Sequence, residues 1–176
     1  LRTHPLTSDR IADMEARSAS APYQQVQDSL DFQLVRARLR AADGTPQDAV
    51  AAARAALKER RFSNETAARY TLVAALVRAR LFKEAEAELK PLLAASPVHP
   101  MIQQLAAQAA LAAGNTARAL DRYAAGVSAH PGYRPLQYGY TAALIASGRH
   151  ADALERLERQ LTLYPLDRRL WRLAAE

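Results

Sequence analysis

The chain has 176 residues, of which 49% are apolar and 24% charged, and it contains no cysteine. Without cysteine it has neither disulfide bonds nor thiolate metal sites. Only six glycines, together with abundant Ala, Leu, Arg and Glu, indicate an all-helical protein. No apolar run approaches the roughly 20 residues that a transmembrane helix needs, so we expect no membrane span.

The formal net charge is +6, which would attract an acidic partner and is compatible with nucleic acid. The 24 basic residues are scattered among 18 acidic ones rather than gathered in one run. Such mixing is typical of an ordinary solvated surface, so we expect no nucleic-acid partner.

In chain order, the first predicted helix begins at Thr7 or Ser8, either of which can cap it, and ends near residue 17. A linker-like segment follows at residues 16–22. The next helices are predicted at about 23–42 and 47–60, separated by a turn at Gly44. Residues 63–95 contain another helix pair, and Pro91 lies inside its second helix. Because an interior proline removes a backbone hydrogen bond, we expect a bend or a restart there.

The clearest pattern lies between residues 100 and 131. A helix is predicted at about 101–113, a turn at Gly114 and Asn115, and a second helix at 116–129. The last complete pair is predicted within residues 134–165. Beyond it, Asp167 can cap a helix that contains Trp171.

Several residues recur at an interval of 34: Pro97, Pro131 and Pro165; Ala85, Ala119 and Ala153; and Gly114 and Gly148. This helix–turn–helix period resembles that of the tetratricopeptide repeat (TPR), in which stacked helix pairs bury apolar faces that no pair can cover alone. The resemblance implies close-approach and packing positions at Val73, Ala85, Leu89, Ala107, Ala119, Tyr123, Thr141, Ala153 and Leu157. The usual aromatic residue near the start of the first helix is replaced by Arg69, Gln103 and Gln137. We predict an all-α, right-handed TPR superhelix (α-solenoid) of about four helix pairs plus flanking helices.

The opening of the chain does not fit the repeat. Its pattern THP-L-x-x-x-R-I, carried by Thr3, His4, Pro5, Leu6, Arg10 and Ile11, resembles the segment that closes the catalytic domain of HExxH zinc metallopeptidases of the BepA-like type, the beta-barrel assembly-enhancing proteases. In that branch a TPR array follows the catalytic domain. The resemblance implies that residues 1–22 are the end of a metallopeptidase domain and a linker, and that residues 23–176 are the array. Its units are expected near 30–61, 66–97, 100–131 and 134–165, with a partial unit at 168–176.

The chain begins at Leu1 and its last helical pattern is still open at Glu176, so we expect a piece of a longer protein. It contains no HExxH motif, and we therefore expect no peptidase activity and no cofactor in the piece itself. By resemblance the longer chain is a zinc metalloendopeptidase in the periplasm. His4 would lie near its zinc site, where a neutral imidazole can fill the open coordination position. The alternative is that His4 only shapes the start of the first helix.

A TPR array binds its partners on the concave face, formed by the first helix of each pair. The repeat plan places a candidate groove for an extended peptide at Arg38, Tyr70, Arg78, Gln104, Gln108 and Tyr138. Amides would bond the peptide backbone and rings would pack on its side chains. The two tyrosines have an alternative interpretation as packing residues between units.

The resulting hypothesis is a protein–protein interaction scaffold that recruits outer-membrane assembly machinery or misassembled clients to its own protease domain. A free-standing TPR adaptor that binds a peptide segment is the first alternative. A basic nucleic-acid-binding solenoid is the second, and it predicts affinity that falls steeply with salt.

Overall fold

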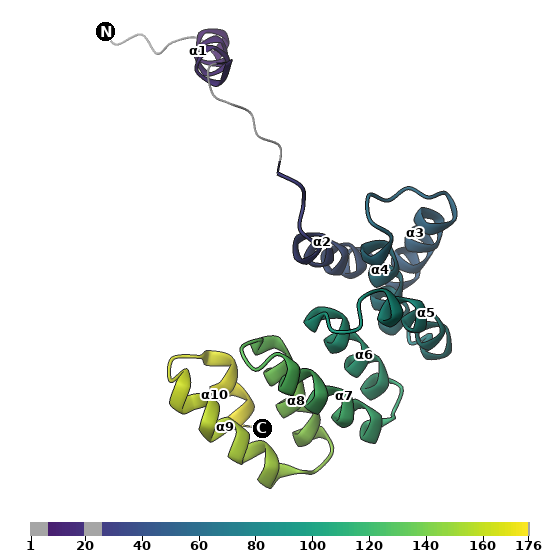
Figure 1. Cartoon of the computed structure of the whole chain (residues 1–176), viewed down its shortest axis with the longest axis vertical. Helices are drawn as coiled ribbons and strands as arrows, with labels where there is room; N and C mark the ends of the chain where they lie inside the picture. The colour runs from purple at the N-terminus through teal and green to yellow at the C-terminus, as the bar shows by residue number, and fades with distance from the viewer. Residues whose placement is uncertain (1–6, 20–25, 176) are drawn as a thin grey trace.

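The computed structural model describes residues 7–19 and 26–175, and within these ranges the chain forms ten α-helices and no strand. The helices are α1 (Thr7–Ala19), α2 (Leu30–Ala42), α3 (Pro46–Lys58), α4 (Glu65–Arg78), α5 (Phe82–Ala95), α6 (Pro100–Ala112), α7 (Thr116–Ala129), α8 (Arg134–Ala146), α9 (His150–Leu163) and α10 (Arg168–Ala174). From α2 onward, antiparallel helices stack side by side along a curve, while α1 stands apart at the N-terminal end (Figure 1). No described helix is long and apolar enough to cross a membrane.

Local signals fix where most helices begin. The side chains of Ser29, Thr45 and Asn64 accept hydrogen bonds from backbone N–H groups in the first turns of α2, α3 and α4. Asn115 does the same for α7 and Asp167 for α10. Each cap satisfies an N–H that the helix itself leaves without a partner, so these polar residues set the helix starts.

The core is a chain of three apolar clusters rather than one centre. One cluster joins α2, α4, α5 and α6, and a second joins α2, α3, α4 and α5. The third joins α6 to α7, α8 and α9. Ala74 and Val77 border the first two clusters, and Tyr133 borders the first and the third. Each helix pair therefore buries its apolar side against its neighbours, as in a solenoid.

The small and packing positions predicted from the 34-residue period are all buried. They are Val73, Ala85, Leu89, Ala107, Ala119, Tyr123, Thr141, Ala153 and Leu157. The alanines among them let helix axes approach closely, because small side chains do not hold the backbones apart. The helix at Thr116–Ala129 has its predicted bounds.

Two helix predictions were wrong in part. The helix predicted from residue 23 begins at Leu30, because Ser29 caps it there and Val26, which is 81% exposed, has no packing partner that would favour an earlier start. At Pro91 a bend or a restart was predicted; the restart does not occur, since α5 runs through the proline. Pro91 and Ala87 both lie on the exposed face. Water can therefore bond the carbonyl that the proline leaves without an N–H donor.

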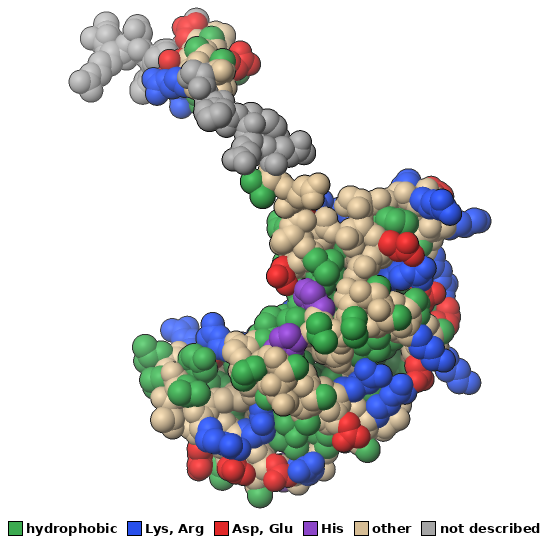
Figure 2. Space-filling view, in the orientation of Figure 1, with side chains coloured by type: hydrophobic (Ala, Val, Ile, Leu, Met, Phe, Trp, Pro, Cys, Tyr) green, Lys and Arg blue, Asp and Glu red, His purple; other side chains and the backbone are tan. Residues whose placement is uncertain are grey.

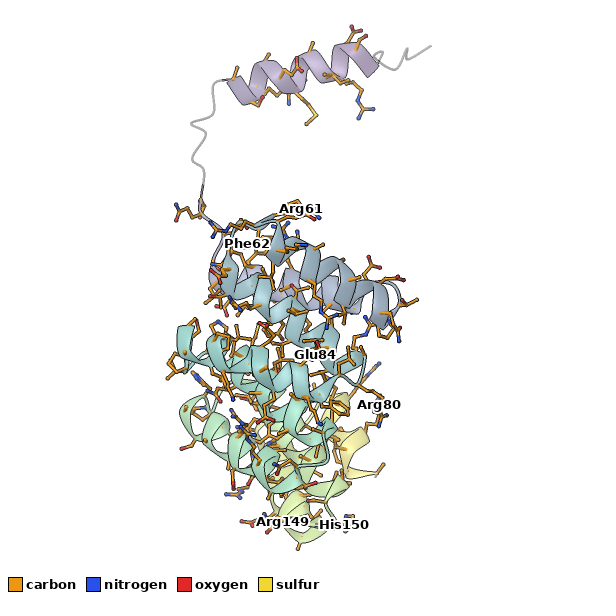
Figure 3. The ribbon with its side chains drawn as sticks, turned by 90° about the vertical axis from the view of Figure 1, so that its right-hand side faces the viewer. Arg61, Phe62, Arg80, Glu84, Arg149 and His150 are labelled. Atoms are coloured by element: carbon orange, nitrogen blue, oxygen red, sulfur yellow. The ribbon has the colours of Figure 1, made fainter. Side chains whose placement is uncertain are left out.

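The first helix pair differs from the others. α4 packs closely against both α2 and α3, whereas α2 and α3 contact each other much less (Figure 1). Between these three helices lies an alanine-lined cavity of about 360 Å³. Arg61 and Phe62, which follow α3, lie on its rim at the N-terminal end of the array (Figure 3).

Candidate partner-binding surface

The molecule is hollowed on the side where α2, α6 and α8 come together (Figure 2). Basic and acidic side chains are interspersed over the face that this view shows. The predicted groove residues all lie on the first helix of a pair, that is on α2, α4, α6 or α8.

A polar cluster joins α2 to the starts of α6 and α8. Nδ1 of His99 accepts a hydrogen bond of 3.3 Å from the backbone N–H of Met101 and thereby caps α6. Its Nε2 lies 3.1 Å from Oδ1 of Asp31 on α2. The geometry therefore assigns the neutral tautomer with the proton on Nε2, which donates to the carboxylate.

Tyr133 lies immediately before α8 and packs on apolar residues of two clusters. Burial raises the pKa of its phenol, with opposing smaller effects of nearby Arg38 and Asp31. Arg38 also acts electrostatically on Tyr70. The guanidinium of Arg38 is therefore close to the half-buried ring of Tyr133 and the buried ring of Tyr70, while its own side chain is exposed.

Gln104 and Gln108 lie one turn apart on α6 and so share a face of that helix. Gln104 is half-buried and Gln108 is exposed. Neither side-chain amide makes a hydrogen bond within the described residues, so both retain the donors and the acceptor that a peptide backbone can use. Together with Arg38 they are the predicted groove residues whose polar groups remain open to a ligand.

The other predicted groove residues have structural roles. Tyr70 is only 5% exposed and packs within the first core cluster, where burial raises its pKa to about 12. Arg78 donates to the carbonyl oxygens of Ala41 and Gly44 and so closes the C-terminal end of α2. These two side chains hold neighbouring units together, and we exclude them from the candidate surface.

Tyr138 is engaged as well. Its hydroxyl donates to Oδ2 of Asp167, and the guanidinium of Arg169 lies 4.9 Å from its ring centre. Arg134 also contacts Oδ2 of Asp167, at 3.3 Å. This ring therefore fastens α8 to α10, which fits the packing interpretation of Tyr138 better than a free binding ring.

The histidines contribute no metal site in the described part of the chain. His4 lies outside the described residues. His99 caps a helix, Nε2 of His130 contacts the carbonyl of Val98, and His150 is the first residue of α9. No cluster of three or more His, Cys, Asp or Glu side chains in the described ranges has the geometry to hold a metal ion.

One repeated contact was missed in the sequence. Nε2 of Gln103 and Nε2 of Gln137 donate to the carbonyls of Pro97 and Pro131, and Nε1 of Trp171 donates to that of Pro165. Donors and acceptors are each 34 residues apart, so a glutamine amide replaces the tryptophan N–H in two units. The 34-residue spacing of these residues was visible in the sequence. The sequence did not show that each of their side chains donates an N–H to a proline carbonyl.

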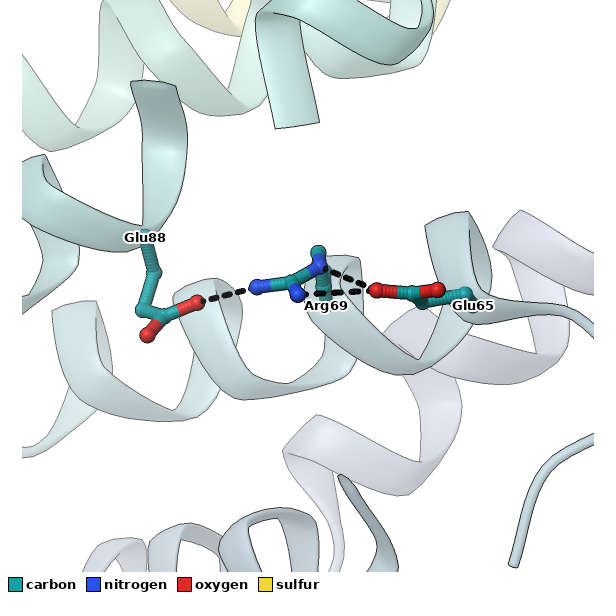
Figure 4. A network of polar contacts seen from close by, with 3 residues as sticks. All are labelled: Glu65, Arg69 and Glu88. Carbon is teal, nitrogen blue, oxygen red and sulfur yellow. Dashed lines mark hydrogen bonds and ion pairs between the residues drawn. The ribbon is translucent and has the colours of Figure 1, made fainter. Parts of the chain in front are cut away.

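Arg69 occupies the corresponding position in the preceding unit and behaves differently. Its guanidinium contacts Glu65 at 2.8 Å and Glu88 at 3.0 Å, which ties α4 to α5 (Figure 4). The hydrogen bond with Glu65 is the largest cause of its raised pKa. In this unit an ion-pair network takes the place of the side-chain bond to a proline carbonyl.

Comparison with known proteins agrees with this architecture. A family model of the tetratricopeptide repeat matches residues 110–176, which include α7 to α10. No curated protein matches the chain. The described chain is thus an all-helical solenoid with a TPR repeat region. Repeats of this type are protein–protein interaction scaffolds whose curvature creates an extended concave surface.

Proposed function

We propose that the array binds an extended segment of a protein partner along its concave side, with Gln104, Gln108 and Arg38 as its polar contacts. The observation that carries the proposal is the pair of amides on one face of α6, whose hydrogen-bonding groups are unused within the described chain. Two amides one turn apart can each donate to and accept from a peptide backbone. Arg38 adds a charged donor that prefers a carboxylate on the bound segment.

Selection from a phage-displayed library of random 12-residue peptides would test this surface. Peptides retained by the wild-type array should lose at least about tenfold in affinity for a Gln104→Ala/Gln108→Ala variant, since a few lost hydrogen bonds amount to roughly 1.4 kcal/mol. Arg149→Ala is a control, because Arg149 precedes α9 rather than lying on α6, and its guanidinium pairs with Asp152 (Figure 3). Equal retention by the wild type and the double variant would contradict the proposal.

We further propose that this scaffold serves a periplasmic zinc metallopeptidase and brings outer-membrane assembly machinery or misassembled clients to it. The support is the segment from Thr3 to Ile11 alone. Residues 7–11 of that segment lie on α1, and residues 3–6 are outside the described ranges. The described residues do not supply a zinc site, so the metal and the peptidase chemistry would belong to a domain preceding Leu1.

The gene sequence immediately upstream of the codon for Leu1 decides this second proposal. It should encode an HExxH motif followed by a further acidic or histidine ligand. An upstream open reading frame without this motif would leave the free-standing adaptor as the function, with peptide binding on the concave side unchanged.

A further inference from the structure

Helix α2 is apolar on two opposite faces. Leu34, Ala37 and Ala41 face the core and are almost completely buried. Phe32, Val35 and Leu39, here called the α2 stripe, lie nearly opposite them at 49%, 48% and 66% exposure. At 100° per residue these three fall on one line along the helix. A helix that is apolar on its outer face at the end of a solenoid is expected to be covered, because terminal units need a polar outer face or a cap.

Helix α1 carries a matching apolar edge. Ile11 and Met14 are 52% and 72% exposed, and Ser18 continues their line one turn further on. α1 and α2 are both 13 residues long, so each measures about 20 Å. Only residues 20–29 separate the two helices, and ten residues reach up to about 33 Å. The chain length therefore allows α1 to fold back along α2.

An antiparallel arrangement also matches the charges. In an antiparallel pair, the residue number rises along one helix as it falls along the other, so the numbers of facing residues add up to nearly the same total. If Met14 faces Val35, Ile11 therefore faces Leu39. Glu15 follows Ile11 by four residues, and Arg36 follows Phe32 by four, so each lies on the same flank of its apolar line. When two such helices pack antiparallel, the side that follows the apolar line of one helix lies against the side that follows the apolar line of the other. Glu15 therefore comes beside Arg36.

On the opposite flanks the same residue sums place Arg17 beside Asp31 but Arg10 beside Arg38, so Glu15 and Arg36 are the charge pair that favours the arrangement. Arg36 already contacts Asp28, but at 3.5 Å and with both side chains 46% exposed, so it remains available to a further carboxylate.

We propose that α1 docks antiparallel on the α2 stripe and forms a detachable N-terminal cap of the array. In the structure α1 is separate and both apolar faces are exposed, so docking is a second arrangement of the same chain (Figure 1). The short connection raises the effective concentration of α1 at the stripe to the order of millimolar, which favours even a weak contact. This docking uses neither Gln104 nor Gln108 of the concave surface.

Cysteine cross-linking tests the docked arrangement, because the chain has no cysteine of its own. In a Met14→Cys/Val35→Cys variant the two thiols face each other in the proposed register, within the Cα separation of up to about 7 Å that a disulfide needs. At micromolar protein and under mild oxidation, the monomer should form an intramolecular disulfide, measured by intact mass and thiol titration. The matched control is Ala16→Cys/Val35→Cys, since Ala16 lies on the face of α1 opposite its apolar edge.

We expect the Met14 pair to oxidise at least tenfold faster than the Ala16 pair. In the Met14→Cys/Val35→Cys background, Glu15→Arg should slow the reaction, and the addition of Arg36→Glu should restore it. Equal rates for the two pairs would overturn the proposal, because a tether without a docked register gives no preference. A disulfide that forms only between two chains would also overturn it and identify a second copy as the occupant. Circular dichroism on each variant establishes that the helices are intact.

Discussion

At the scale of single residues, the turns inside the helix pairs show how the 34-residue period constrains the backbone. Gly114 and Gly148 have φ of 83° and 76°, and Arg80, which lies 34 residues before Gly114, has φ of 60°. At all three turns the following N–H bonds back to the carbonyl five residues earlier, at 2.9 Å. This is the Schellman arrangement, which needs a left-handed residue and prefers glycine.

Arg80 is therefore strained where its counterparts are not. A non-glycine residue in this region costs roughly 1–2 kcal/mol, and glycine recovers that at an entropic cost of about 0.5–1 kcal/mol. We expect Arg80→Gly to raise the free energy of unfolding by about 1 kcal/mol, measured by urea denaturation. Arg80→Ala, which keeps the strain and removes the same guanidinium, is the control (Figure 3). A glycine variant no more stable than the alanine variant would refute the explanation.

Thr141 offers a second comparison between units. It is fully buried, as are Val73 and Ala107 at the corresponding positions, and its hydroxyl has no hydrogen-bond partner among the described residues. Thr141→Val keeps the shape and removes the unsatisfied oxygen, so thermal or urea unfolding should show a gain of about 1 kcal/mol. Thr71→Val is the control, because the Thr71 hydroxyl donates to the carbonyl of Ala67 at 3.0 Å. A similar gain in the control would show that the effect does not come from the missing bond.

Sequence reasoning succeeded at the residue scale where the repeat itself sets the environment. Ala119 was identifiable because its position holds alanine in three successive units, where two helices must approach closely. The sequence does not distinguish buried Tyr70 from exposed Gln108, since the repeat pattern places both on the concave side. Only the folded structure shows how deeply each side chain is buried. Arg80 was missed because the left-handed turn there has no glycine to signal it.

At the scale of elements, α10 is attached by one polar cluster. Asp167 caps it, accepts from the Tyr138 hydroxyl, and has a side chain only 9% exposed. The hydrogen bond from Tyr138 is the largest cause that lowers the pKa of Asp167, assisted by backbone N–H groups and Arg134 and opposed by burial. A carboxyl with a lowered folded-state pKa stabilises the fold above its ordinary pKa, and this contribution disappears as the pH falls through the folded-state value.

Trp171 reports on this attachment because it lies on α10 and is the only tryptophan of the chain. In the wild type, acidification should change its fluorescence with a midpoint below the ordinary Asp pKa of about 3.9. Tyr138→Phe removes the main cause of the lowering, so its midpoint should move upward toward that value. Asp167→Asn should lack this transition. An identical midpoint in the wild type and Tyr138→Phe would show that the hydroxyl does not set the pKa.

Helix ends were predictable where a capping residue coincided with a turn that recurs after 34 residues, as at the start of α7. The start of α2 was predicted too early, because an apolar spacing that includes Val26 looks helical whether or not anything covers it. The continuity of α5 through Pro91 depends on which side of the helix meets water, and this is a property of the folded array.

At the scale of the whole molecule, the stacking of pairs followed from the sequence, but the connection between the clusters did not. The first pair departs from the period, and the structure shows α4 packed against both α2 and α3. Tyr133 connects two of the clusters, because it packs against both the cluster around α4 and α6 and the cluster around α7 and α8.

In an array of nearest-neighbour contacts, cooperativity depends on the interfaces between units. Tyr133→Ala removes a large ring from one of these interfaces, at a cost of about 3 kcal/mol or less for a half-buried side chain. The C-terminal helices should then unfold at lower urea than the N-terminal ones. Trp171 fluorescence, which reports on α10, should show a lower midpoint than circular dichroism, which reports on all helices. In the wild type the two midpoints should lie closer together.

Val127→Ala is the matched control, since Val127 is half-buried and packs against the third cluster alone. It should lower stability without separating the two midpoints as far as Tyr133→Ala does, because it leaves the interface between the clusters intact. Equal separation in the two variants would mean that the C-terminal helices are independent of Tyr133. In that case the coupling between the two ends of the concave surface would have to come from the backbone contacts of α6 with α7 and α8, rather than from the ring that borders both clusters.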